Sequence, residues 1–275
     1  MTNRNSSPER QNQPEEKFKI RFTSLLKPAI YAIVFSCLYS LAYLWISGQI
    51  ENQPASLAAQ ILLVSVYGVG LYFVCTLVWG KQHGVLNLSC TGKVFGWNIV
   101  WAAAAALISW LYVMVISSSS LFLLLAVQIL AGVLLIFLIP FTLLFYKGVY
   151  EKEEDLKSLL AGVWKSFLKA PTGVLNPWLL LFLALVGWDT LFSGPMGIYY
   201  GFNAAGLLSS LIFIGNPMFY WMMLLYVSGG QGAFMYMIIL YILSGLIFTW
   251  LWLNLAAWTG TKWMGSRSVK KADSN

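Results

Sequence analysis

The sequence predicts an all-α polytopic membrane protein: a bundle of about six transmembrane helices with an amphipathic helix on its cytoplasmic side. The 275-residue chain is 59% hydrophobic and only 10% charged, whereas water-soluble domains are about 25% charged. Its apolar residues form runs of roughly 20, the length that crosses a bilayer core as a helix. These runs lack the alternation of strands, and in lipid a single segment satisfies its backbone only as a helix.

The N-terminal residues 1–27 are polar and contain too few apolar side chains to form a core. We therefore expect a disordered cytoplasmic tail. The apolar run that follows has full spanning length and begins too late for a cleavable signal peptide. Residues 28–263 are expected to form a single transmembrane domain, and residues 264–275 a basic cytoplasmic tail.

Six apolar runs are long enough to cross the membrane. The expected spans are 28–48, 57–79, 94–116, 121–146, 174–192 and 233–258. Tryptophans lie near the ends of these runs, at the headgroup level that amphipathic rings prefer. They are Trp45, Trp79, Trp97, Trp178, Trp188, Trp258 and Trp263.

The basic residues predict the orientation, because cytoplasmic loops retain Lys and Arg. All 17 fall in the N-terminal tail, the second-to-third connection, the fourth-to-fifth connection or the C-terminal tail. An even number of crossings brings these four segments to one side, so both termini are expected in the cytoplasm. The opposite loops carry Glu51, the serines 117–120 and a long uncharged stretch.

The sequence of that uncharged stretch, residues 195–232, is compatible with more than one topology. Residues 204–227 are apolar enough to cross, but Gly215-Asn216-Pro217 interrupts them, and a crossing would move the basic C-terminus outside. Two short helices at the outer interface fit best, with a re-entrant pair and a true crossing as alternatives. A break at membrane depth would have to face protein or water.

Residues 151–169 have the pattern of an amphipathic helix that ends before Pro171. Its apolar stripe comprises Leu156, Leu159, Leu160, Val163, Trp164, Phe167 and Leu168. Lys157, Ser158, Lys165 and Ser166 form the opposite face. Glu151, Glu153, Glu154 and Asp155 fill the expected first turn, and Lys165 and Lys169 the last, which suits the helix dipole.

Such a helix is expected at the inner membrane interface, against anionic headgroups and the base of the bundle. It either simply connects the fourth and fifth spans or docks a cytoplasmic partner. The candidate lipid or partner contacts are Leu156, Leu160, Trp164, Lys165 and Phe167.

Asp189 is the one acid within a predicted span, and an intramembrane carboxylate is a functional candidate because its burial is costly. Its place near the outer interface suits equally a cap for the next short helix. If the chain transports a solute, Asp189, Asn216 and Pro217 are the candidate lining of a polar path.

The residue types that several enzyme classes require are missing from the sequence. His83 is the only histidine, which excludes a His-Glu-x-x-His metalloprotease helix, and no Walker-type phosphate loop occurs. Cys37 and Cys75 lie in apolar runs and Cys90 in a short polar loop, without metal-ligand spacing. We expect no enzymatic activity, metal, cofactor or nucleic-acid partner.

Small residues in the predicted spans allow helices to approach closely. They include Gly68, Gly70, Gly92, Gly96 and Ala102–Ala106.

The order of features over roughly residues 120–190 resembles a loosely defined group of bacterial six-helix membrane proteins. One span ends at Ile139-Pro140-Phe141, and the amphipathic stretch contains Lys165-Ser166-Phe167. The group includes the membrane domain attached to some glycerophosphodiester phosphodiesterases, whose soluble catalytic domain does not occur here. The resemblance implies a bacterial inner membrane location and no catalytic residue.

These observations favour a non-enzymatic membrane component that acts through lipids or protein partners. A transporter or permease subunit for a small solute is the alternative, and a lipid-modifying enzyme is a third hypothesis.

Overall fold

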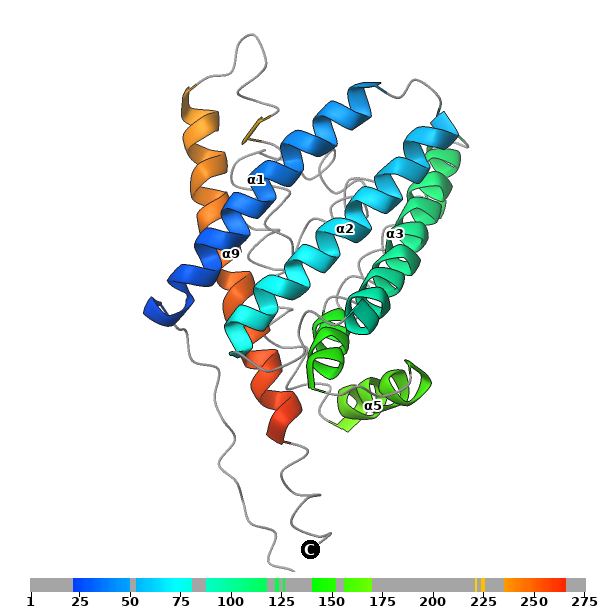
Figure 1. Cartoon of the computed structure of the whole chain (residues 1–275). Helices are drawn as coiled ribbons and strands as arrows, with labels where there is room; N and C mark the ends of the chain where they lie inside the picture. Colours follow the sequence, from blue (N-terminus) through cyan, green and yellow to red (C-terminus); the bar gives the residue numbers. More distant parts are fainter. Residues whose placement is uncertain are drawn as a thin grey trace, which may run out of the picture.

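A computed structural model of the protein describes residues 22–49, 53–80, 88–117, 140–151, 156–169 and 235–265, with positions 122–123, 126, 221 and 224–225 between them. Regular structure in these ranges is helical throughout, and none of them contains a strand. The helices are η1 (Thr23–Leu25), α1 (Leu26–Gln49), α2 (Gln53–Trp79), α3 (Leu88–Ser117), α5 (Leu156–Lys169) and α9 (Met235–Gly265) (Figure 1). Residues 140–151 form a further helical segment.

Three of the helices are long and apolar enough to cross a membrane. Their spanning parts are Thr23–Ile46, Leu57–Trp79 and Tyr241–Thr259, which matches the first, second and last predicted spans. α3 covers the predicted span at 94–116, and segment 140–151 includes the end of the span predicted at 121–146. The span predicted at 174–192 lies outside the described residues, as does nearly all of 195–232.

α1, α2 and α3 start earlier than the hydropathy pattern indicates. η1 and the first two residues of α1 precede residue 28, and Leu25 is buried in the core. α3 begins at Leu88, so Cys90 lies in a helix rather than in the predicted polar loop. Cys90 and Val94 are one turn apart and both buried, and the Cys90 Sγ lies 3.9 Å from the Val149 carbonyl oxygen. Packing against segment 140–151 therefore extends α3 beyond its apolar run.

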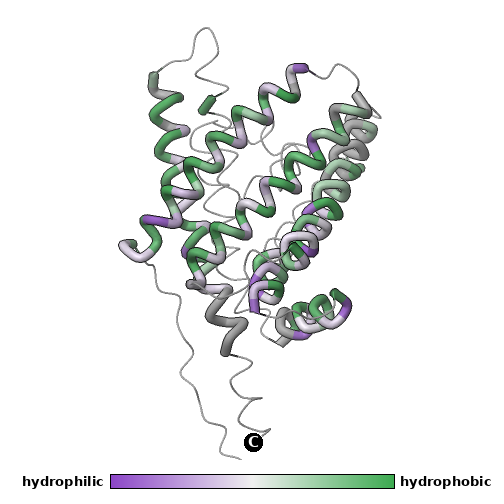
Figure 2. Tube along the Cα trace, in the orientation of Figure 1, coloured by the Kyte–Doolittle hydropathy of each residue, from purple (hydrophilic) through white to green (hydrophobic). Residues whose placement is uncertain are grey.

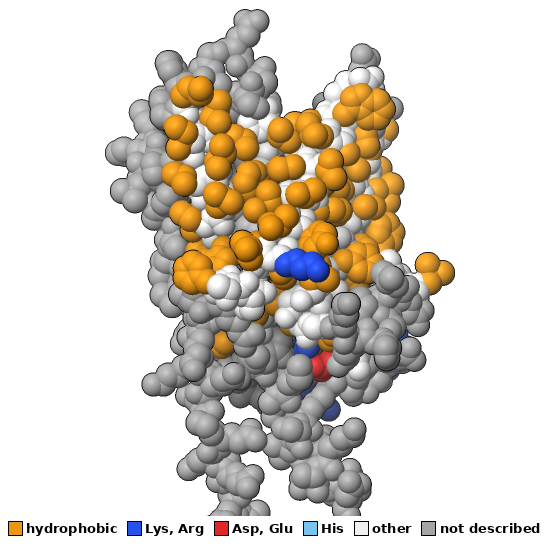
Figure 3. Space-filling view, turned by 60° about the vertical axis from the view of Figure 1, so that its left-hand side comes forward, with side chains coloured by type: hydrophobic (Ala, Val, Ile, Leu, Met, Phe, Trp, Pro, Cys, Tyr) orange, Lys and Arg blue, Asp and Glu red, His pale blue; other side chains and the backbone are white. Residues whose placement is uncertain are grey.

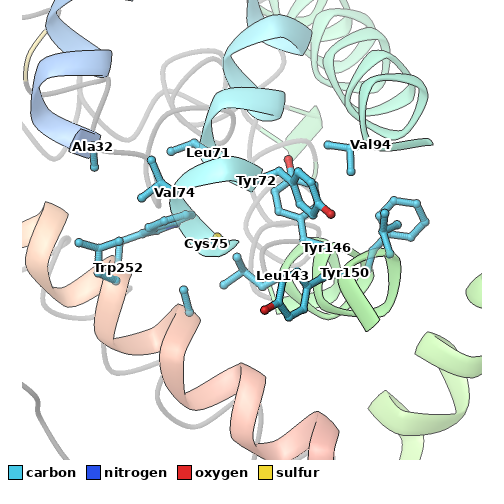
Figure 4. Packing of buried hydrophobic residues seen from close by; sticks show 14 of the residues in the cluster. Ala32, Leu71, Tyr72, Val74, Cys75, Val94, Leu143, Tyr146, Tyr150 and Trp252 are labelled. Atoms are coloured by element: carbon cyan, nitrogen blue, oxygen red, sulfur yellow. The ribbon is translucent and has the colours of Figure 1, made fainter. Parts of the chain in front are cut away.

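α2 occupies the centre of the bundle. It packs on α1, α3 and α9, and α1 also packs on α9 (Figure 1). Figure 4 shows the core around α2, to which every neighbouring element contributes. Its buried side chains include Ala32, Leu71, Tyr72, Val74, Cys75, Val94, Leu143, Tyr146, Tyr150 and Trp252.

The outer surface of these helices is apolar as well as the core. Figure 2 shows hydrophobic residues along α1, α2 and the coloured part of α9, and hydrophobic side chains cover most of the described face in Figure 3. On α1 the exposed row is Ile30, Val34, Leu38, Leu41 and Trp45. Because a soluble monomer rarely exposes so large an apolar area, this surface suits lipid.

The described basic residues lie at one end of the bundle, which we name the basic end. The start of α1, the end of α2, the start of α3, the ends of segment 140–151 and α9, and α5 all lie there (Figure 1). These elements carry Lys27, Lys93, Lys147, Lys157 and Lys165. α5 lies at this end beneath the start of α3, with its axis closer to horizontal in Figure 1 than those of α3 and α9.

Candidate functional site

α5 is shorter than the predicted helix 151–169. It begins at Leu156, and its first turn contains no acidic residue. Glu151 instead ends segment 140–151, where its Oε1 lies 3.4 Å from the Lys147 Nζ one turn earlier. The attraction of this pair keeps Glu151 on the preceding helix. The other predicted first-turn acids, Glu153, Glu154 and Asp155, fall outside the described residues.

The apolar stripe of α5 is divided between two environments. Leu159 is 2% exposed and Val163 fully buried against the bundle. Leu160 is half-buried, but Leu156, Trp164 and Leu168 are 44%, 54% and 56% exposed. The Phe167 side chain is outside the described set. The bundle therefore covers only one edge of the stripe.

The division between buried and exposed side chains follows the rows of side chains along α5. Residues four apart lie above one another on a helix. The inner row contains Leu159 and Val163, and the outer row contains Leu156, Leu160, Trp164 and Leu168. The next row around the helix, the lysine row, contains the exposed Lys157, Ala161 and Lys165. An apolar strip thus lies between the bundle on one side and two exposed lysines on the other.

Aromatic contacts fix the position of α5 on the bundle. The Trp164 ring lies 6.2 Å from that of Phe141, and Phe141 lies 5.6 Å from Trp97 of α3. Trp97 also stacks on Phe145 at 4.8 Å, and its Nε1 donates a hydrogen bond to the Thr142 Oγ1. Trp164 is therefore anchored through one edge of its ring, although more than half of it is exposed.

A second group at the basic end, the Lys147 cluster, comprises Trp79, Lys147, Tyr150 and Glu151. The Lys147 side chain is fully buried, with its Nζ 5.0 Å from the Trp79 ring and 4.7 Å from the Tyr150 ring. Within the described residues this Nζ has the Glu151 ion pair but no hydrogen bond. Burial lowers the pKa of Lys147, and the Glu151 carboxylate opposes that shift.

The same cluster joins three elements. The Trp79 Nε1 donates to the Ala256 carbonyl of α9 at 2.9 Å, and the Tyr150 hydroxyl donates to the Gly80 carbonyl. Gly80 ends α2 with a φ of +97°, a left-handed conformation that glycine adopts readily at a helix C-terminus. The ends of α2, α9 and segment 140–151 are held together here.

A third group, the Asn98 cluster, lies further inside the bundle. The Tyr146 hydroxyl is 2.8 Å from the Asn98 Oδ1 and 3.1 Å from the Gly68 carbonyl oxygen, so its hydrogen is shared between two acceptors. The Asn98 Nδ2 donates to the Val94 carbonyl. A Cβ on Gly68 would lie 2.3 Å from the Asn98 Cγ. Gly68 therefore allows the close approach predicted for it, and so does Gly70, whose Cβ would meet Phe35 at 2.0 Å.

Sequence reasoning identified α5 but neither polar cluster. Lys147 directly follows an apolar run, and the sequence indicates only that it is one of the basic residues of the fourth-to-fifth connection. Asn98 and Tyr146 received no role, although a single asparagine within the long apolar run of the third span is the signal that could have found them. The interfacial position of Trp97 gave no indication that it faces Phe145.

The other candidate site residues cannot be located within the described part of the chain. Asp189, Asn216, Pro217 and His83 lie outside them, so a polar path through the membrane stays a prediction. Among the side chains that the structure does place, no three His, Cys, Asp or Glu residues converge as in a metal site.

Comparison with known proteins finds no family model that matches the chain, and no curated protein or solved structure that is similar to it. The resemblance to bacterial six-helix proteins therefore stays a prediction as well.

Proposed function

We propose that this protein is a six-span component of a bacterial inner membrane with both termini in the cytoplasm. In this proposal it carries out no catalysis and acts through lipids or protein partners at its basic end. The apolar outer surface of α1, α2 and α9 supports the membrane location.

The divided stripe of α5 carries the proposal. Leu156, Trp164 and Leu168 are exposed at the end of the bundle, where the described lysines also gather. Exposed apolar strips of this kind mark interaction sites with lipids or proteins. A helix whose only task was to connect two spans would not need Trp164 on its uncovered edge.

The arrangement of the helix ends supports the topology. α1 runs away from the basic end, α2 returns to it, α3 leaves it and segment 140–151 returns (Figure 1). α9 also ends there. An even number of crossings between the start of α1 and the end of α9 therefore places all the basic segments on one side, and lysine-rich segments stay in the cytoplasm.

Cysteine accessibility in intact cells tests this proposal. In a background with Cys37, Cys75 and Cys90 replaced by Ala, we expect a membrane-impermeant maleimide to label Ser118→Cys from outside. Ser268→Cys should react only after the cells are permeabilised. Labelling of Ser268→Cys but not Ser118→Cys in intact cells would place the basic end outside and overturn the proposed orientation.

A further inference from the structure

The outer row of α5 leaves a strip of apolar surface that the described parts of the bundle do not cover. Its exposed members, Leu156, Trp164 and Leu168, span three turns of the helix. We propose that this strip and the lysine row beside it bind the anionic phospholipid headgroups of the membrane that surrounds the bundle. The inference rests on the proposed membrane function and names its partner.

Charge complementarity favours an anionic lipid surface as the occupant. From Leu156 to Lys169 the helix contains no acidic residue, and Lys157 and Lys165 are exposed next to the outer row. An apolar row flanked by lysines matches a headgroup region, since acyl chains lie beside the apolar row and phosphates beside the ammonium groups. Lysine stems can also lie along apolar surface while their amines reach the phosphates.

The position of α5 favours the same occupant. It lies at the basic end, and its axis in Figure 1 is closer to horizontal than the steep axes of α3 and α9, as expected for a helix near the plane of an interface. Trp164 is anchored on Phe141 by one edge and exposed by the other. Half-exposed tryptophan is typical of the headgroup level, where one side of the ring is apolar and the other wet.

The lysines should determine how strongly α5 prefers an anionic surface. Each basic residue close to such a surface favours binding by about fivefold, and the effect is screened by salt. Replacing both Lys157 and Lys165 by Gln should therefore weaken the preference by roughly 30-fold. α5 itself should remain attached to the bundle in this variant through Leu159 and Val163 of its inner row.

A fluorescent label tests the inference in the full-length chain. Leu168→Cys, in a background with Cys37, Cys75 and Cys90 replaced by Ala, carries an environment-sensitive dye in nanodiscs. The discs contain either phosphatidylcholine alone or an equal mixture with phosphatidylglycerol. We expect the dye to be shielded from acrylamide, a neutral quencher that the lipid charge does not repel, only in the mixture, and high salt or Lys157→Gln/Lys165→Gln to abolish the shielding. Lys27→Gln, at an exposed lysine outside α5, is the matched control and should leave it unchanged.

Two further labels separate the possible failures. Leu38→Cys on the exposed face of α1 should be shielded in both kinds of disc, and Ser158→Cys on the far face of α5 in neither. If Leu38→Cys is quenched, the proposed membrane function fails. If Leu38→Cys is shielded but Leu168→Cys is quenched equally in both lipids, the lipid inference fails alone. Shielding of Leu168→Cys in native membranes but in neither disc would also overturn it and assign the strip to a protein partner.

Discussion

Tyr146 and Lys147 are neighbours on one helical segment, yet they enter polar clusters of opposite kinds. Tyr146 reaches into the bundle, where its neutral hydroxyl donates to two neutral acceptors, the Asn98 amide oxygen and the Gly68 carbonyl. Lys147 stays at the basic end, where one carboxylate and two ring faces surround an amine that forms no hydrogen bond with the described residues. Their contacts on α2, Gly68 and Trp79, are about 16 Å apart along the helix axis.

The difference shows how depth in the bundle selects the polar groups that join helices. Neutral groups that satisfy one another can be buried at low cost, whereas a buried charge is expensive even with a partner. The charge therefore lies at the end of the bundle, where Glu151 remains partly exposed. Changes at the two levels should have different consequences.

The largest effect is expected at the basic end. Val163 is fully buried between α5 and the bundle, so Val163→Glu would leave a carboxylate without a partner, at a cost of about 3 kcal/mol or more. We expect α5 to detach while α1, α2, α3 and α9 stay packed. Limited proteolysis of the purified protein should show cleavage within α5. Lys157→Glu is the control on the exposed lysine row, and equal cleavage in that variant would contradict the assigned orientation of α5.

A smaller effect is expected inside the bundle. Gly68→Ala forces a methyl group against Asn98, whose side chain is held by Tyr146 and Val94. Such overpacking costs about 1–3 kcal/mol, measured as a lower unfolding temperature in detergent. Gly92→Ala, where no described atom lies within 4 Å of the added methyl, should be neutral or slightly stabilising because alanine favours helix. Asn98→Ala should remove most of the Gly68→Ala defect, and a purely additive double variant would contradict the contact.

The smallest effect concerns the charge on Lys147. Burial lowers its pKa in the folded protein below the ordinary 10.5, so in alkaline solution the unfolded chain binds a proton that the folded chain has released. Stability should therefore rise with pH as it passes from the lowered pKa towards 10.5. Thermal unfolding of the native protein should show this rise, and Lys147→Met should have a flatter profile. Parallel profiles for the two proteins would contradict the burial of a charged amine.

The broad architecture could be predicted from the sequence because hydropathy reports directly on what surrounds a helix. The apolar runs at 28–48, 57–79 and 233–258 correspond to α1, α2 and α9, and the periodicity of residues 156–168 corresponds to α5. The start of α3 was missed because Cys90 is held in a helix by Val149, which is 59 residues away in sequence. A local pattern contains no information about such a contact.

The candidate site could be predicted only in part for a related reason. Periodicity places Leu159, Val163 and Trp164 on one stripe, but it cannot tell which edge of the stripe meets the bundle. Val163 is fully buried, whereas Trp164, which contacts Phe141, is 54% exposed. In the same way, Lys147 looks like any other lysine after a span until the Trp79 and Tyr150 rings are placed around it.

The hydrogen bond from Trp79 to Ala256 has a consequence for the order in which the chain is assembled. The two residues are 177 positions apart, and synthesis from the N-terminus completes α2 long before α9 exists. Until α9 arrives, the Trp79 indole N–H lacks the Ala256 carbonyl, and in the proposed topology headgroups and water at the basic end can accept from it instead. The last helix therefore displaces lipid or water from an already inserted partner. The contact between α2 and α9 at the basic end therefore forms late in biogenesis.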